Sequence, residues 1–520
     1  MELLINLGGT DDTFLIRWFL LLIVGTVIVT VIAGLCLTRW RWKLHRVYFL
    51  VVLWFGLFYM AVFSPLSAPD EVVHFVTAYE LSDRLMLTPA RDSDDHIRIR
   101  AEDEYIVNWP GDNDPTKATV LGMTLDRAVY EELHEHGLFK MTRQGMDVTW
   151  QVPAVTTPLA YLCPAVGISI ARLLHMSCFG LLFMGRLMNL LLFTILGTLA
   201  VKRMPIGRMV VFVLSLFPMT LELAASYSYD AFLLPLAFTL ISEVLRLSYT
   251  ERDIRVSDAV RLSILAVLLA PCKMIYATLF LLCLMIAPRK FGSDHTYIRN
   301  YILAILLIDV MIVGSILLVN FREFFRYVNT TGTVAPELDS EGNVQTVVYH
   351  DLMELVRDKT LIFRVIRNSF QILGGEYLGT TVGMWLSAMD RSLGAPVWMC
   401  ILFWTLLLVA AIAPDYDEPS LGITRRLLML ATGLLTGLLL FVSMFTAYTP
   451  KDTWYILGIQ GRYFIPFLPL LLLPFHISGR PADPILRRIP IIQVQNVSII
   501  LSLCMNIYVL CTNFFTIINR

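Results

Sequence analysis

The stretch "VYFLVVLWFGLFYMAVFSPLSAPDEVVHF", residues 47–75, passes from an apolar run into a short polar segment. An apolar run of this length is typical of a helix that crosses a lipid bilayer. The polar segment places Asp70, Glu71 and His74 within one helical turn of the membrane surface. The stretch therefore predicts a transmembrane helix whose exit carries two carboxylates and an imidazole.

The composition of the whole chain agrees with this prediction. Of the 520 residues, 57% are hydrophobic and 16% are charged, and the mean hydropathy is +0.67. Such values predict an all-α integral membrane protein that crosses the bilayer many times. The net charge of -1 argues against a nucleic-acid partner. The eight cysteines lie in or beside apolar segments and predict neither disulfides nor a metal site.

Apolar runs recur along the chain and predict about twelve transmembrane helices. We expect them at 14–37, 47–65, 180–200, 208–225, 230–248, 259–270, 273–288, 299–320, 396–413, 426–447, 463–477 and 491–515. The short connections, such as "TRWRWKLHR" and "VKRMPIGR", are rich in Lys and Arg and fall on one side. The positive-inside rule makes that side cytoplasmic, so both termini and the long loops 66–157 and 321–395 face out.

Several segments depart from the simple pattern. Residues 157–176 are nearly long enough to span but carry prolines and charges, so we expect a re-entrant or surface-lying helix. The runs 259–270 and 273–288 are interrupted by "APCK", which predicts a broken helix and a cavity near Lys273. The turn-like "NWPGDNDP" suggests that loop 66–157 is partly folded, and helical spacing over 350–373 predicts an amphipathic surface helix.

Ionisable residues gather at the outer ends of the expected helices. Burying charge in a bilayer is costly, so such positions are functional candidates. The group comprises Asp70, Glu71, Arg186, Glu222, Asp230, Lys273 and Arg462. A transporter would instead be expected to place such residues near the midplane. The pattern favours a pocket that opens to the outer leaflet, in which Lys273 and Arg462 are the cations that a phosphate site needs.

Structural explanations compete with the functional one. Ser67 and Asp70 match the S-x-x-D capping box, so Asp70 could cap a helix that begins beside it. That cap does not explain Glu71 and His74, which share a helix face. Asp230 could likewise cap the helix that follows "SYSY", and Arg462 could be an interfacial anchor.

Seven segments carry a family resemblance. They are "PDEVVHFVTAYELS", "TPLAYLCPAVGISIARLL", "GRLMNLLL", "LFPMTLELAASYSYD", "CKMIYA", "GEYLGTTVGMWLSAMD" and "GIQGRYFIPFLPLLLL". In this order they resemble the bacterial membrane family known as domain of unknown function 2142. The likeness runs over 46–520 and leaves 1–45 as an extra N-terminal helix with a basic loop. Val72 stands where the family pattern P-D-E-P-x-H has its second proline.

That family is in turn similar to the GT-C class of membrane glycosyltransferases, which use polyprenyl-phosphate sugars. The resemblance implies a GT-C-like fold and sugar transfer to a cell-envelope glycan or lipid at the outer face of the bacterial cell membrane. It makes Asp70 the first candidate for a general base or metal ligand and Glu71 the second, and His74, on the same helix face as Glu71, is the third catalytic candidate. The implied substrate-binding and phosphate-binding residues are Arg186, Asn189, Tyr227, Asp230, Lys273, Tyr276, Gln460, Arg462 and Tyr463.

Two alternatives stay open on the sequence alone. A divalent cation, Mg²⁺ or Mn²⁺, held by Asp70, Glu71 and His74 has the same residue spacing as a base with an orienting partner. A transporter, flippase or scaffold for lipid-linked glycans would use the same cations to bind a phosphate head group without breaking a bond.

Overall fold

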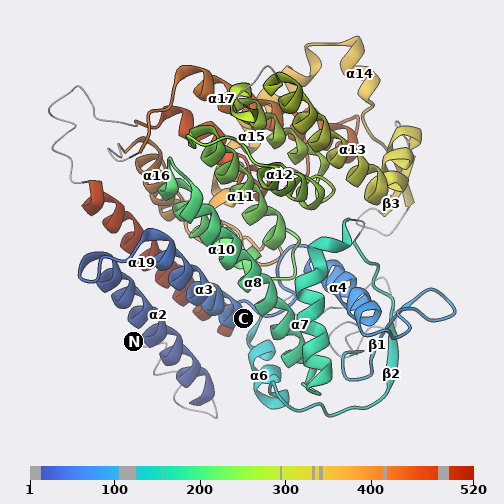
Figure 1. Ribbon diagram of the computed structural model, residues 1–520. Coiled ribbons are helices and arrows are strands. Elements are labelled where there is room, and N and C mark those ends of the chain that lie inside the picture. Colours follow the sequence, from blue (N-terminus) through green and yellow to red (C-terminus); the bar gives the residue numbers. More distant parts are fainter. Residues whose placement is uncertain are drawn as a thin grey trace.

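A computed structural model describes residues 13–104, 125–154, 156–292, 296–330, 334–338, 344–413, 418–477 and 491–520, with the backbone alone for 322–330, 334–338, 344–347 and 491 (Figure 1). Most of these residues are helical, and the strands are confined to two short antiparallel pairs. The predicted all-α architecture of a multi-pass membrane protein is therefore confirmed within this part of the chain.

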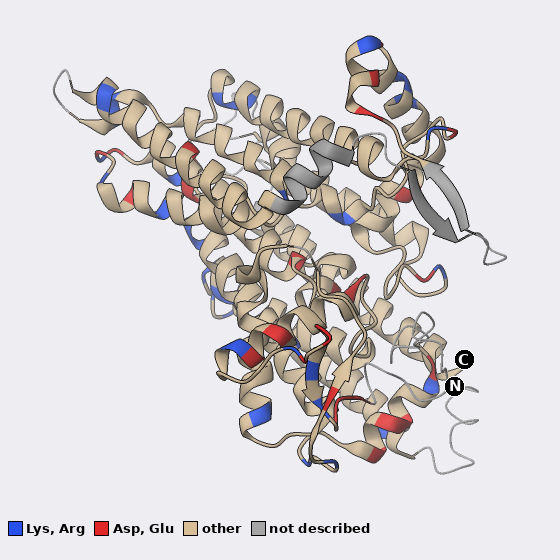
Figure 2. Cartoon of the chain, turned by 90° about the vertical axis from the view of Figure 1, so that its right-hand side faces the viewer, with Lys and Arg blue, Asp and Glu red and all other residues tan. Residues whose placement is uncertain are grey.

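Seven helices among the described residues are long and apolar enough to cross a membrane. They are α2 (Thr13–Thr38), α3 (Leu44–Val62), α8 (Cys178–Arg203), α11 (Asp230–Tyr249), α13 (Tyr297–Thr330), α17 (Ile423–Tyr448) and α19 (Ile491–Ile518). Each corresponds to one of the twelve expected segments. Helices suit apolar runs because their backbone groups are all bonded within the segment. Figure 2 shows that Lys, Arg, Asp and Glu are sparse along the long helices.

The other five expected segments form shorter or interrupted helices, so the count of twelve is not confirmed. They are α9 (Arg208–Ser215) with α10 (Pro218–Ala224), α12 (Val256–Leu269), the 3-10 helix η3 (Met274–Met285), α16 (Val397–Ile412), and η5 (Gly461–Phe464) with α18 (Leu468–Leu472) and η6 (Leu473–Phe475). Prolines explain most of the breaks, because proline lacks a donor and clashes with the preceding turn. Pro218 opens α10 and Pro271 lies in the predicted break between α12 and η3.

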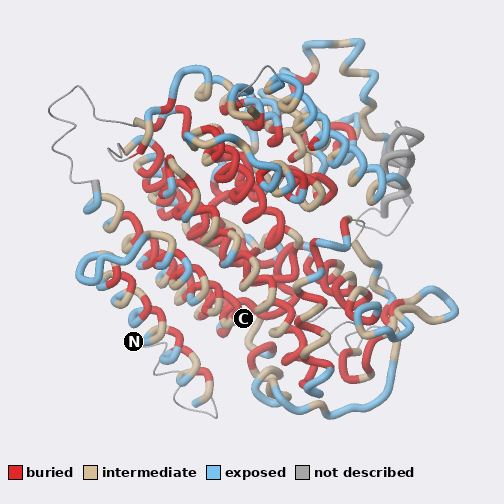
Figure 3. The backbone as a smooth tube through the Cα atoms, viewed as in Figure 1, coloured by how far each residue is buried: buried red, intermediate tan, exposed pale blue. Residues whose placement is uncertain are grey.

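Helix α11 lies at the centre of the bundle. Of its most apolar stretch, 94% is buried, against 6% for α13 at the periphery. It packs against α8, α10, α12 and η3, and Figure 3 shows the buried residues concentrated along these helices. On the other side of the bundle, α2, α3 and α19 lie side by side (Figure 1). The Tyr59 hydroxyl donates to Asn506 Oδ1 at 2.7 Å and ties α3 to α19.

Loop 66–157 is partly folded, as expected. It contains α4 (Glu71–Leu85), β1 (Ile97–Arg100), α6 (Arg127–His136) and β2 (Met146–Thr149). The strands pair antiparallel from Ile97↔Thr149 to Arg100↔Met146. The turn-like "NWPGDNDP" lies outside the described residues. Beyond the loop, η2 (Pro158–Tyr161) and α7 (Leu162–Leu173) pack on α4 and α8, and this segment is too short to be a candidate span.

The second expected loop, 321–395, is mostly helical. Helix α13 continues to Thr330, and the antiparallel strands β3 (Val334–Leu338) and β4 (Val344–Val348) follow it, paired from Val334↔Val348 to Leu338↔Val344. The predicted amphipathic segment forms α14 (Leu352–Arg357) and α15 (Leu361–Val382). Helix α15 packs against η5, which carries Arg462.

The bundle has two ends. At the α4 end, the Tyr130 hydroxyl of α6 bonds the last carbonyl of α3 at Val62. At the opposite end, several short connections meet, and η4 (Pro288–Phe291) supplies Lys290, which donates to the Thr250 carbonyl after α11. Helix α8 runs from one end to the other over 26 residues, a length of about 39 Å at 1.5 Å per residue. We call these the α4 end and the short-connection end.

Candidate functional site

All residues of the connection between α3 and α4 are buried except Asp70. Residues 63–69 and Glu71 are buried, whereas 69% of the Asp70 side chain is exposed. Two non-glycine residues of this connection have left-handed backbone conformations, with φ of 66° at Leu66 and 58° at Asp70. Such conformations are uncommon and often occur at functional sites, where the surrounding structure enforces them. Here the enforced turn holds the Asp70 carboxylate at the protein surface.

The capping role predicted for Asp70 is wrong. Asp70 is itself the N-cap residue of α4, and its side chain makes no capping hydrogen bond. The Ser67 hydroxyl instead donates to the Ser64 carbonyl at 2.7 Å. Glu71 closes the turn, because the Ala68 N–H donates to Glu71 Oε2 at 3.0 Å. The capping interaction is displaced by one residue and leaves the Asp70 carboxylate available.

Glu71 points into the protein rather than toward a surface site. It is 1% exposed and accepts a hydrogen bond from the Tyr227 N–H at 2.9 Å through Oε1. Arg186 Nε lies 3.5 Å from the same oxygen. Arg186 also donates to the Phe63 and Ala225 carbonyls, and Asn189 donates to the Ser226 carbonyl at 2.8 Å. The side chains of Glu71, Arg186 and Asn189 therefore join the turn before α11 to the end of α3.

A second group, at the surface, surrounds Arg462. Its Nη2 lies 3.5 Å from Asp70 Oδ2 and its Nε lies 3.7 Å from Asp230 Oδ2. The Arg462 side chain is 4% exposed, and its Nε and Nη1 make no hydrogen bond. Buried polar groups normally have hydrogen-bond partners, so the two unbonded guanidinium nitrogens beside an exposed carboxylate have hydrogen-bonding capacity that no described residue meets.

Lys273 completes this group through an aromatic contact. Its ammonium lies 3.3 Å from the centroid of the Tyr463 ring, and the Arg462 guanidinium carbon lies 5.4 Å from the same centroid. The Tyr276 hydroxyl donates to the Tyr463 carbonyl at 2.8 Å and fixes the backbone between the two cations. Cations at such distances from a ring are attracted by its electron-rich face. We call Asp70, Asp230, Lys273, Arg462 and Tyr463 the Arg462 cluster.

Helix α15 positions the segment that carries Arg462. The Gly461 N–H donates to the Thr380 hydroxyl at 3.1 Å, and the Thr381 hydroxyl donates to the Gly461 carbonyl at 3.1 Å. A Cβ at Gly461 would lie 2.0 Å from the Thr381 backbone nitrogen, so only glycine permits this approach. The neighbouring Gln460 has a buried Oε1 without a hydrogen-bond partner. The two threonines lie in the quoted motif "GEYLGTTVG", but helical spacing gave no sign of their contact with Gly461.

His74 lies behind the Arg462 cluster. Its Nδ1 is 2.7 Å from the Tyr161 hydroxyl, and the Tyr229 ring meets it edge-on at 5.3 Å between centroids. Sequence reasoning missed both tyrosines, although Tyr161 lies in the quoted motif "TPLAYL" and Tyr229 in "SYSYD". Burial, reinforced by the Arg462 charge, lowers the pKa of His74 from 6.5 to about 3. His74 is therefore neutral at physiological pH.

This shift predicts an acid-sensitive fold. Because His74 is neutral when folded and binds a proton below pH 6.5 when unfolded, stability falls as the pH decreases from about 6.5 toward 3. Thermal unfolding midpoints in detergent, measured over this range, should fall less steeply in His74→Gln than in the wild type. Substitution of the exposed His175 by Gln should leave the slope unchanged. Equal slopes for His74→Gln and the wild type would contradict the prediction.

The proposed metal set of Asp70, Glu71 and His74 does not fit this geometry. The Glu71 oxygens are bonded to the Ala68 and Tyr227 amides, and His74 Nδ1 is bonded to Tyr161. Among the described residues, the one group of three whose ligand atoms lie within 4.8 Å of one another is Asp92, Asp94 and His96, on the loop before β1. No step of a reaction is therefore assigned to a metal at Asp70.

Fold and site together define a class: a helical multi-pass membrane protein with a charged cluster where α4, α11, η3 and η5 meet. Within that class the chain belongs to the family described as "Predicted membrane protein (DUF2142)", whose model matches residues 53–471. The match contains the whole Arg462 cluster and leaves α2 and α19 outside. No curated protein and no solved structure matches the chain.

Proposed function

We propose that the protein is a membrane glycosyltransferase that moves a sugar from a polyprenyl-phosphate donor to a cell-envelope glycan or lipid. The proposal places the reaction at the outer face of the cell membrane. The observation that carries it is Arg462, a buried guanidinium with unbonded donors that lies between an exposed and a buried carboxylate. The resemblance of the quoted motifs to the GT-C class supports the same function by analogy.

The cations of the cluster suit the donor phosphate. Arg462 offers a planar fork of N–H groups, which matches two phosphate oxygens, and Lys273, which contacts the same Tyr463 ring, adds a point charge. In transfer, the bond between the anomeric carbon and the phosphate oxygen breaks, and the phosphate leaves with an additional negative charge. Arg462 and Lys273 would stabilise that charge as it develops.

The exposed carboxylate suits the acceptor. The acceptor hydroxyl oxygen forms the new bond to the anomeric carbon, and its proton passes to Asp70, which acts as general base. The total charge of the cluster and its ligands does not change, because Asp70 becomes neutral as the phosphate gains its charge. Asp230 is 8% exposed and lies 3.7 Å from Arg462. We assign Asp230 to orienting the guanidinium, as a positioning residue.

The structure divides the residues that the resemblance implied. Asp70, Asp230, Lys273, Arg462 and Tyr463 contact one another directly or through the Tyr463 ring. Within the proposal Asp70, Lys273, Arg462 and Tyr463 bind substrate or take part in the reaction, and Asp230 orients the Arg462 guanidinium. The remaining implied residues are assigned positioning roles: the polar groups of most of them bond backbone atoms, His74 bonds the Tyr161 hydroxyl, and Gln460 has a buried Oε1 without a hydrogen-bond partner. This second set comprises Glu71, His74, Arg186, Asn189, Tyr227, Tyr276 and Gln460.

The test measures polyprenyl phosphate, the product that all such donors release. Purified full-length protein in lipid vesicles is incubated with a panel of radiolabelled polyprenyl-phosphate hexoses and pentoses and with envelope glycan acceptors. We expect release of polyprenyl phosphate together with label in the acceptor for at least one donor, and neither in protein-free vesicles. If donors bind and cross the bilayer but no polyprenyl phosphate is released, the protein is a transporter or flippase rather than an enzyme. Binding with neither outcome would identify a scaffold.

A further inference from the structure

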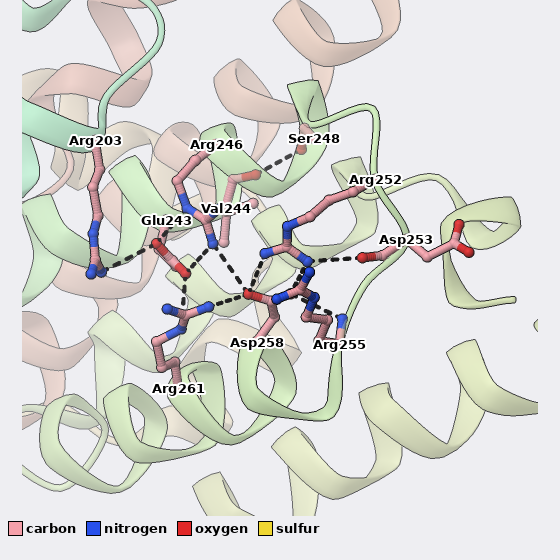
Figure 4. Close-up of polar contacts among 10 residues, drawn as sticks. All are labelled: Arg203, Glu243, Val244, Arg246, Ser248, Arg252, Asp253, Arg255, Asp258 and Arg261. Carbon is pink, nitrogen blue, oxygen red and sulfur yellow. Dashed lines mark hydrogen bonds and ion pairs between the residues drawn. The ribbon is translucent and has the colours of Figure 1, made fainter.

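A second charged cluster lies at the short-connection end and has no part in the proposed reaction (Figure 4). Its centre is formed by two buried carboxylates, Glu243 of α11 and Asp258 of α12, whose side chains are 1% and 0% exposed. Four arginine side chains surround them, each 26–39% exposed: Arg203, Arg246, Arg252 and Arg261. The carboxylates are thus enclosed, and the guanidinium groups form the surface above them.

The contacts with Asp258 saturate its oxygens. Arg252 Nη1 and Nη2 donate to Asp258 Oδ2 and Oδ1 at 2.7 and 2.9 Å. Arg246 Nη2 donates to Oδ1 at 3.2 Å, Arg261 Nη2 donates to the same oxygen, and the Arg255 N–H donates to Oδ2 at 3.0 Å. A carboxylate offers about four acceptor positions. Asp258 therefore cannot bind the remaining donors of these arginines.

Glu243 is also shared among several cations. Arg246 donates to both of its oxygens, at 3.0 and 2.7 Å. Arg203 Nη1 lies 3.5 Å from Oε2, and Arg261 Nε lies 3.4 Å from Oε1 without forming a hydrogen bond. Arg203 makes the fewest contacts of the four arginines, because its one contact within the cluster is the ion pair with Glu243. Its other guanidinium donors are available to a ligand.

The cluster carries more positive charge than its helices need. Its four arginines and two buried carboxylates have a net charge of +2. One cation for each carboxylate would be sufficient to join α8, α11 and α12. Each guanidinium has five N–H donors, and most of the donors in this group have no carboxylate oxygen left to bind. An external anion with several oxygens, such as a phosphate group, would supply the missing acceptors and charge.

An apolar surface extends from the arginines along α12. Val256, Val260 and Ile264, spaced by one helical turn, are 81%, 46% and 53% exposed. The cluster lies at the ends of the candidate spans α8 and α11, which puts it at the depth of the membrane boundary. A charged group beside an apolar helix face at that depth is complementary to a phospholipid, whose phosphate and acyl chain occupy the same two regions.

We infer that the arginine cluster binds the phosphate of an anionic phospholipid, with an acyl chain of that lipid along Val256, Val260 and Ile264. The site is independent of the proposed function, because it lies at the other end of the bundle from the Arg462 cluster. Arg203 and Arg252, which contact different carboxylates, bring donors from the end of α8 and from the connection after α11. The bound lipid would hold these two segments together.

The test compares two lipids that differ in head-group charge. Purified full-length protein in detergent is titrated with fluorescent phosphatidylglycerol and with phosphatidylcholine. Each basic residue near a membrane contributes about fivefold to the binding of an anionic lipid, so an excess of two charges should give a preference of about 30-fold for phosphatidylglycerol. Arg203→Gln should reduce this preference about fivefold, and Arg203→Lys should largely preserve it. Equal binding of the two lipids by the wild type would refute the inference.

Two controls separate lipid binding from helix joining. Arg364→Gln removes an arginine of α15 that is 62% exposed and ion-paired with Asp358, and it should leave the preference unchanged. Ile264→Asn alters the apolar face without touching a carboxylate, so it should weaken lipid binding at an unchanged melting temperature in lipid-free detergent. Glycerol phosphate should fail to displace the lipid. Displacement at equal concentrations, or an unaltered preference in Arg203→Gln, would show that the arginines serve another purpose.

Discussion

Replacing Asp70 with asparagine is expected to lower the turnover of polyprenyl-phosphate sugars by a factor of about 10²–10⁴, the size of a general-base contribution. The fold should be preserved for two reasons. The Asp70 side chain is 69% exposed, and its contact with Arg462 is long, at 3.5 Å. Asparagine also tolerates the left-handed conformation that Asp70 adopts. Turnover would be measured as polyprenyl phosphate released by purified protein, alongside its thermal unfolding midpoint.

Asp95 provides a matched control for this substitution. It also has a left-handed backbone, with φ of 68°, and it is 81% exposed and ion-paired with Arg91 at 2.8 Å. Asp95→Asn therefore removes the same charge from the same backbone conformation, but away from the Arg462 cluster. Turnover should stay at the wild-type level. If Asp70→Asn and Asp95→Asn were equally active, Asp70 would have no role as base.

The second large effect is expected in stability rather than in turnover. Arg186→Gln leaves the Glu71 carboxylate buried without its counter-ion, 3.5 Å from where the guanidinium was. Breaking a buried pair by removing one partner costs about 3–5 kcal/mol. Glu71→Gln should have a similar effect, because it leaves Arg186 as an uncompensated buried charge. Both variants should unfold at clearly lower temperature in detergent, and both should lose folded protein on purification.

An exposed ion pair gives the comparison for these variants. Glu131 pairs with Arg127 at 2.6 Å on α6 but is 44% exposed, so Glu131→Gln should cost less than about 1 kcal/mol. The experiment also separates the two roles considered for Glu71. If Glu71 were catalytic, Glu71→Gln would lower turnover and leave the unfolding temperature unchanged. If Glu71 instead forms the interior pair with Arg186, Glu71→Gln must lower the unfolding temperature.

The sequence predicted the long helices well because their signal is local. Apolar runs of bilayer length produced α2, α3, α8, α11, α13, α17 and α19 close to the expected positions. The shorter elements were harder, because hydropathy counts apolar residues and does not locate the point at which a helix stops. Pro218 divides one expected span into α9 and α10, and residues 461–475 contain three prolines and form the three short helices η5, α18 and η6.

The candidate site was predicted in part. Topology correctly suggested that Asp70, Asp230, Lys273 and Arg462 would meet, since all four lie where an expected span ends. The sequence could not predict that Asp70 is exposed while Glu71 is buried. Helical spacing places neighbouring carboxylates near each other, but it does not identify which one will meet the Tyr227 amide, 156 residues later in the chain. The capping box likewise predicted a contact between Ser67 and Asp70, whereas the corresponding hydrogen bond joins Ala68 and Glu71, one residue further along.

The 3-10 geometry of η3 affects how far Lys273 can reach. A 3-10 helix rises about 2.0 Å per residue, so the 12 residues of η3 span about 24 Å, against about 18 Å for the same residues in an α-helix. The 3-10 helix is thus about 6 Å longer than an α-helix of the same residues would be. With the far end of η3 held in place, rewinding it into an α-helix would draw Lys273 back by that length and separate its ammonium from the Tyr463 ring. The position of one cation relative to its aromatic partner is therefore set by the pitch of the helix that follows it.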